Sequence, residues 1–152
     1  MKNNSGFTLI ELMIVVEIIA IVVAIVIPDY MRARIQTNET VAVKSLRTIL
    51  DAQVSYNSAH LVYATNYAEL SSGDPPFLDP GFQPVRNGYQ YTVAGEPYFF
   101  TALATPVEFG DTGWRGFYID ATGVIRSQLG APANAESPPL GSSDADDGAA
   151  AG

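Results

Sequence analysis

Two glutamates, Glu11 and Glu17, stand inside an apolar run near the N-terminus. Of the 21 residues from Phe7 to Ile27, only these two and Thr8 are not apolar. As a helix the run would be about 31 Å long, which matches the hydrocarbon core of a bilayer. An acidic side chain at the centre of such a helix costs about 2.5–3.5 kcal/mol, so a carboxylate there indicates a functional role and needs a partner. Length and charge alone fit a membrane anchor with an incidental glutamate equally well.

A cleaved secretory signal is the alternative for an apolar run that follows a short polar stretch with one lysine, Lys2. The run is followed by Pro28 to Met31, and not by the small residues of a signal-peptidase site. We therefore expect the helix to stay attached to the chain. Lys2 lies on one side of the run and Arg32 and Arg34 lie on the other, so these charges do not fix its orientation.

The stretch from Gly6 to Val16 strongly resembles the class III signal of type IV pilins and of the related type II secretion pseudopilins. The resemblance implies that a prepilin peptidase cuts after Gly6 and methylates the new N-terminal residue, Phe7. Glu11 then falls on the family's subunit-assembly glutamate at the fifth mature position. Pro28 falls on the proline that interrupts the long helix at the twenty-second.

Glu17 departs from this resemblance, since the family usually has a small or apolar residue at that position. It lies six residues beyond Glu11, so on a helix the two side chains point about 120° apart and cannot share one partner. No Lys or Arg lies within the apolar run. We therefore expect Glu17 to be protonated in lipid, and a second ion pair between subunits is the alternative.

The resemblance implies an α+β fold, type IV pilin-like, with a long N-terminal helix on a small antiparallel sheet. Asp29 to Ala59 contains neither Gly nor Pro, which favours a helix, and Pro28 predicts a kink or a locally melted stretch before it. The predicted segments are a leader (1–6), a transmembrane and filament-core helix (7–28), an amphipathic helix (29–59), an αβ loop with an antiparallel sheet (60–129) and a disordered acidic tail (130–152).

The amphipathic helix is expected to pack one face on the sheet. Its apolar stripe is formed by Ala42/Val43, Leu46, Ile49/Leu50 and Val54, at the spacing of a helix face. The polar residues of the helix are expected mostly to face water or neighbouring subunits, without a chemical role. These residues are Arg32, Arg34, Asn38, Glu39, Lys44, Arg47 and Asp51.

Turn residues divide the region after the helix. Residues 60–88 are rich in Ser, Gly, Pro and Asp and predict a long loop. Strand-like runs follow at 89–93, 98–104, 114–120 and 123–127, which pair as two hairpins. The aromatic residues of this half are expected to fill the core. His60 stands alone at the helix end, and we expect it to be structural and not a metal ligand.

From Gly130 onward the chain has almost no large apolar residue, so burial cannot offset the entropy of ordering it. Asp144, Asp146 and Asp147 resemble part of a calcium loop, but the bidentate glutamate of such a loop is missing downstream. The chain also has no cysteine. We therefore expect no metal or cofactor.

The charge distribution bears on partners. The net charge of −8 lies in residues 65–152, which argues against a nucleic-acid partner, because phosphates are contacted mainly by Lys and Arg. The sequence shows no nucleophile paired with a base, no phosphate-binding loop and no metal-ligand spacing. We therefore do not expect an enzyme.

The resemblance implies a structural subunit of a type IV pilus-like filament, with copies of itself, a prepilin peptidase, an assembly platform and motor proteins as partners. The N-terminus would be cytoplasmic and the globular part periplasmic while the helix spans the inner membrane, before the subunit enters an extracellular or periplasmic filament. The alternatives are a major pseudopilin of type II secretion, and a minor tip pilin that binds a surface ligand or DNA.

Overall fold

The N-terminal helix α1 runs from Leu9 to His60 without interruption in the computed structural model, which describes residues 6–142. The helix contains Pro28, where the sequence predicted a kink or a melted stretch, and it stays helical on both sides of that residue. The locally melted form of the prediction is therefore wrong, and the kink stays a prediction. The chain divides into two compact units at Arg34 and Ile35, and α1 contributes to both.

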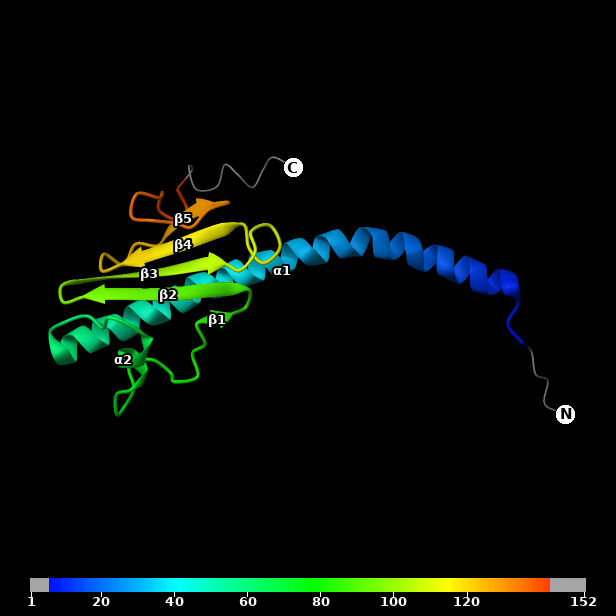
Figure 1. Cartoon of the computed structure of the whole chain (residues 1–152). Coiled ribbons are helices and arrows are strands. Elements are labelled where there is room, and N and C mark those ends of the chain that lie inside the picture. The colour runs from blue at the N-terminus through cyan, green and yellow to red at the C-terminus, as the bar shows by residue number, and fades with distance from the viewer. Residues whose placement is uncertain (1–5, 143–152) are drawn as a thin grey trace. The chain divides into compact units, whose positions relative to one another are not determined.

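The second unit, which we call the head unit (residues 35–142), contains one sheet of five antiparallel strands (Figure 1). Each strand pairs with the next one along the chain, so the sheet is a simple meander. The predicted α+β, pilin-like fold is confirmed. The elements after α1 are α2 (Tyr67–Ser71), β1 (Val85–Arg86), β2 (Tyr89–Glu96), β3 (Phe99–Pro106), β4 (Arg115–Asp120) and β5 (Arg126–Leu129).

The two predicted hairpins form with small changes of boundary. Strand β2 continues beyond the predicted run of 89–93 through Gly95, and Glu96 pairs with Phe99 across a two-residue turn. A side chain at Gly95 would collide with the backbone of Ala64, so glycine is required by this close approach. Strand β5 begins at Arg126, three residues later than predicted. The sequence patterns missed β1 and α2, which are only two and five residues long.

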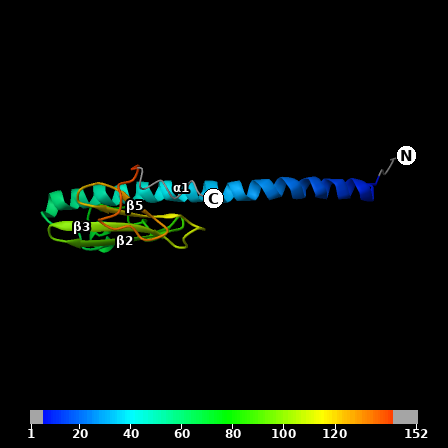
Figure 2. The same ribbon diagram turned by 90° about the horizontal axis from the view of Figure 1, so that it is seen from above.

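The sheet and the C-terminal half of α1 enclose the core of the head unit (Figure 2). Alternate residues of β2 and β3 point toward the helix and are buried, as period-two strands require. Four core residues of the sheet are aromatic, Tyr89, Tyr91, Phe100 and Phe117, and for these the expected role in packing is confirmed, whereas Tyr98 and Phe99 are exposed. The main members of the cluster are Ala42, Leu46, Ile49, Tyr89, Tyr91, Val93, Phe100, Ala102, Ala104, Phe117 and Ile119.

The apolar stripe of α1 is confirmed up to Ile49 and fails at its last position. Val54 is half exposed, and Gln53 is fully buried in its place. The Gln53 amide donates to the Ala64 carbonyl oxygen and accepts from the Ala64 N–H, both at 2.9 Å. A buried amide is tolerated only when it is hydrogen-bonded, and here it fastens the chain that leaves α1.

The C-terminal segment of the head unit, residues 130–142, packs against β5. Ser127 N–H donates to the Pro138 carbonyl oxygen (3.0 Å), Leu140 N–H donates to that of Ile125 (2.8 Å), and Ala133 is buried. The predicted disordered tail is therefore wrong for residues 130–142, because backbone hydrogen bonds hold the segment without many large apolar side chains. The remainder of the predicted tail, with its three aspartates, lies outside the described residues.

A truncation after Leu129 should destabilise the head unit. It removes four hydrogen bonds to the rest of the head unit. These are the bonds of the Ser127 and Leu140 N–H groups, the bond from the Gly130 N–H to the Trp114 carbonyl oxygen, and the bond from the Arg126 guanidinium to the Ser137 carbonyl oxygen. At about 1 kcal/mol each, we expect the free energy of unfolding to fall by roughly 4 kcal/mol. Denaturant titration of the full chain in detergent measures this. Truncation after Ser142 is the matched control, since it retains all four bonds, and equal stabilities of the two variants would contradict the assignment.

Candidate functional site

The first turn of α1 is held by Thr8 and Glu11. The Thr8 Oγ1 accepts from the Glu11 N–H at 3.3 Å, and the Thr8 hydroxyl lies 3.5 Å from Glu11 Oε2. The Leu12 N–H also donates to the Thr8 carbonyl oxygen at 3.2 Å. Thr8 is therefore the N-cap, and Glu11 stands at the third helical position, where its carboxylate lies near the Thr8 hydroxyl. The predictions from the sequence did not include this role of Thr8, although threonine followed three residues later by glutamate is a usual signal of a helix start.

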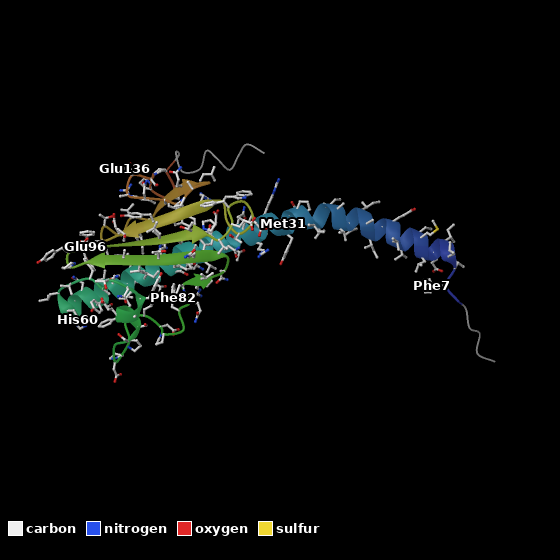
Figure 3. All side chains as sticks on the ribbon, viewed as in Figure 1. Phe7, Met31, His60, Phe82, Glu96 and Glu136 are labelled. Atoms are coloured by element: carbon white, nitrogen blue, oxygen red, sulfur yellow. The ribbon has the colours of Figure 1, made fainter. Side chains whose placement is uncertain are left out.

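The apolar run is exposed along its whole length. No side chain from Gly6 to Arg34 is buried, and Phe7 is 79% exposed. Figure 3 shows these side chains along α1 between the labelled Phe7 and Met31. The stretch is long and apolar enough to cross a membrane, by length and composition. Soluble monomers rarely expose so large an apolar surface, so a membrane, other protein chains or both must cover it.

The structure places the predicted site residues one after another at the start of α1 and along it, on different sides of the helix. Gly6 and Phe7 precede the first turn, Glu11 lies within it, and Glu17 and Pro28 follow along α1. Glu17 is exposed, and its carboxylate makes no hydrogen bond or ion pair within residues 6–142. A partner for the Glu17 carboxylate therefore has to come from outside the described chain.

A second carboxylate, Glu39, lies buried in the head unit, 7% exposed. Its Oε1 accepts from the N–H groups of Trp114 (3.0 Å) and Arg115 (3.1 Å). Its Oε2 lies 3.1 Å from Nε of Arg115 in an ion pair. The neighbouring Asn38 donates to the Thr112 carbonyl oxygen at 2.9 Å. The expectation that Asn38 and Glu39 face water or other subunits is therefore wrong, because both fasten α1 to the 112–115 loop.

Tyr89 extends this buried network. Its hydroxyl donates to the Arg115 carbonyl oxygen at 2.8 Å, and its ring lies where a side chain at Gly113 would otherwise be. Burial raises the pKa of the Tyr89 hydroxyl well above its usual value, and the nearby Glu39 carboxylate raises it further. Tyr89 is therefore neutral at physiological pH and acts as a fixed donor, so the network serves to position the loop.

His60 lies in an aromatic cluster at the end of α1. Its ring centroid is 4.4 Å from that of Tyr56 and 5.9 Å from that of Phe77. Within residues 6–142, no group of three or more His, Cys, Asp or Glu side chains could hold a metal ion. The surroundings of His60 therefore suit packing at the helix end.

An N-terminal apolar helix followed by an antiparallel sheet that packs on its C-terminal half defines a pilin-like α+β protein. Residues 1–27 match the protein family described as the prokaryotic N-terminal methylation motif. The methylation motif therefore covers the stretch that contains Gly6, Phe7, Glu11 and Glu17.

Three relatives of known name extend the match beyond the motif. The chain is 43% identical over 72 residues to the type IV wide pilus major component of Thermus thermophilus, which covers 47% of this chain and 55% of the relative. It is 38% identical over 93 residues to the type IV major pilin of Myxococcus xanthus, covering 60% of this chain and 38% of the relative. It is 35% identical over 109 residues to the type II secretion system core protein G of Pseudomonas aeruginosa, covering 62% of this chain and 77% of the relative.

The chain belongs to the family of type IV pilins and type II secretion pseudopilins. The match to core protein G covers more than three quarters of that relative. The chain spans about half of the first of these pilins and less than half of the second. The names of all three relatives are those of pilus or secretion-system components.

Proposed function

We propose that this chain is the structural subunit of a type IV pilus-like filament, and that its apolar helix forms the filament core. The single observation that carries the proposal is the exposed run from Phe7 to Ile27, none of which is buried within the chain. The membrane covers this surface while the subunit is stored, and the helices of other copies cover it after assembly. When each subunit contacts the next head to tail, and the rotation between neighbours does not bring the series back to the first subunit, the result is an open helical fibre.

The proposed path begins with a prepilin peptidase that removes residues 1–6 after Gly6 and methylates Phe7. The match to the N-terminal methylation motif supports this step. The mature helix then spans the inner membrane with its N-terminus in the cytoplasm and the head unit in the periplasm. An assembly platform and motor proteins supply the work that moves the helix out of the membrane. The other partners are copies of the same chain.

Processing gives the first test of this path. Protein recovered from native filaments should begin at Phe7 with one added methyl group. Gly6→Val should leave residues 1–6 attached, because the proposed cleavage follows this glycine. Intact mass measurement detects both the methylated Phe7 N-terminus of the native protein and the retained residues 1–6 of the variant. Native protein that still begins at Met1, or that begins after Pro28, would contradict the proposed cleavage.

The role of Glu17 gives a second test. It lies about 15 Å along the helix from Phe7, near the middle of the span, so we propose that it stays protonated and hydrogen-bonded. Glu17→Ala should then leave the filament yield within about twofold of wild type and ease membrane insertion. Glu17→Gln is the control, because it retains hydrogen bonding and removes the charge. Loss of filaments in both variants would show that the ionised carboxylate is needed.

The proposed function itself is tested by deletion and complementation. Cells without the chain should lack a class of thin filaments in electron micrographs, and a tagged copy should restore filaments that bind an antibody to the tag along their length. Antibody at filament ends only would indicate a minor tip subunit. Filaments of unchanged number and composition in the deletion strain would overturn the proposal.

A second candidate function is that of a major pseudopilin, which the match to core protein G favours because it covers 77% of that relative. In this case deletion would block the release of proteins across the outer membrane and leave surface filaments unchanged. Comparing the culture supernatant with the sheared cell-surface fraction of the same deletion strain separates the two functions.

A further inference from the structure

A groove of about 490 Å³ lies on the head unit where α1, β4 and the C-terminal segment meet. Val43, Phe117 and Leu140 contribute its apolar surface. Three cationic side chains, those of Lys44, Arg47 and Arg115, also line it. The groove therefore combines apolar surface with a concentration of positive charge on a chain whose net charge is −8.

The positive charge of the groove is only partly balanced by its own residues. Glu39 also lines the groove, but its two oxygens are occupied by two backbone N–H groups and by the Arg115 ion pair. Neither Lys44 nor Arg47 has a carboxylate within salt-bridge distance among residues 6–142. Both lie on the exposed face of α1, three residues apart. Within the described part of the chain, the groove thus presents two positive charges, those of Lys44 and Arg47, that no carboxylate pairs.

We propose that this groove receives an acidic segment from the head unit of a second copy of the chain. The inference rests on the proposed filament function, which brings many copies together. Residues 65–152 hold 11 acidic and 3 basic residues, a net charge of −8, so each copy carries abundant carboxylates to complement the Lys44 and Arg47 cations. Complementary charge of this kind fixes the register and choice of partner more than it adds raw affinity. The contact would determine how neighbouring head units are arranged, while the apolar helices supply most of the apolar surface that is buried on assembly.

The composition of the chain makes the contact open to a specific chemical test. Lys2 and Lys44 are the only lysines, and Lys2 lies in the leader, so Lys44 is the one lysine of the mature chain. A zero-length carbodiimide joins an amine to a carboxylate with loss of water, and only when the two touch. Filaments grown from a mixture of ¹⁴N and ¹⁵N subunits should therefore give covalent dimers in which Lys44 of one chain is joined to an acidic peptide of another.

The isotope pattern decides between the possible sources of the carboxylate. Mixed light and heavy peptide pairs at Lys44 support contact with a second copy. Pairs of one isotope only would place the partner within the same chain, including its C-terminal aspartates, and would overturn the inference. Absence of any product at Lys44 would overturn it as well. The control is Lys44→Arg, which retains the charge and should abolish the product while filaments persist.

Charge variants measure the effect of the contact on assembly. Lys44→Gln with Arg47→Gln should lower the filament yield at physiological ionic strength roughly fivefold or more, and the remaining yield should lose its dependence on salt. Gln90→Glu with Thr92→Glu is the matched control, since it changes the net charge by the same two units at exposed positions of β2. An equal loss in both variants would overturn the inference, because general self-repulsion would explain it. Wild-type cells without filaments would instead overturn the proposed function, and this inference with it.

Discussion

Glu11→Val should be processed normally and should fail to assemble, with a filament yield roughly a hundredfold or more below wild type. We propose that the Glu11 carboxylate pairs with the methylated amino group of Phe7 on a neighbouring subunit as the helix leaves the membrane. In that surrounding each charge compensates the desolvation of the other. Removing one partner leaves the other charge buried and unpaired, which is costlier than replacing the whole pair. Intact mass and the sheared-filament yield measure the two halves of this prediction.

The helix start requires a control, because Glu11 also contacts the Thr8 hydroxyl at the start of α1. Glu11→Gln keeps a side-chain oxygen that can accept from this hydroxyl and removes only the charge. We expect it to assemble as poorly as Glu11→Val. Thr8→Ala is the complementary variant, since it removes the N-cap and keeps the charge, at a cost of about 1 kcal/mol to the helix end. That variant should still form filaments.

The outcomes separate the two roles of Glu11. Filaments from Glu11→Gln at the wild-type level would show that the cap, and not the charge, is what assembly needs. Filaments from Glu11→Val at the wild-type level would contradict both roles. Loss of assembly in Thr8→Ala together with normal assembly of Glu11→Gln would assign the whole effect to the helix end.

The sequence was informative where one physical effect decides the structure. The spacing of apolar residues along the chain determines which residues are buried. It therefore predicted the apolar run, the stripe at Ala42, Leu46 and Ile49, and the two hairpins, with small shifts of boundary. Short elements such as α2 depend on local caps, and Asn66 caps that helix by accepting from the Glu69 N–H. The periodicity of apolar residues carries no information about a five-residue helix of this kind.

The sequence was misleading where a polar residue satisfies a distant backbone. Periodicity assigned Asn38 and Glu39 to the solvent, but both bond to residues more than 70 positions away in the chain. The misprediction of residues 130–142 has a related cause. Their packing depends on backbone hydrogen bonds to β5 and the residue before it, and not on side-chain hydrophobicity. Contacts of this kind depend on which loop the fold brings to the helix, and a single sequence does not contain that pairing.

Loss of the Glu39 carboxylate should destabilise the head unit more than any other single polar substitution on α1. Glu39→Ala removes the carboxylate that accepts from the Trp114 and Arg115 N–H groups and pairs with the Arg115 guanidinium. Breaking a buried pair by removing one partner costs about 3–5 kcal/mol, and the exposure of Arg115 places the expected loss near the lower end of that range. Trp114 is the only tryptophan, so its emission reports denaturant unfolding of the full chain in detergent at the affected loop itself.

Two variants separate the buried pair from a general loss of charge on α1. Asp51→Ala removes an exposed carboxylate from the same helix and should change the free energy of unfolding by less than about 0.5 kcal/mol. Glu39→Gln keeps an acceptor oxygen for the two N–H groups but loses the ion pair, so its cost should lie between those of the other two variants. If Glu39→Ala were as stable as Asp51→Ala, water would be replacing the carboxylate at no cost, and the 112–115 loop would have to be held by Asn38 and Tyr89 alone.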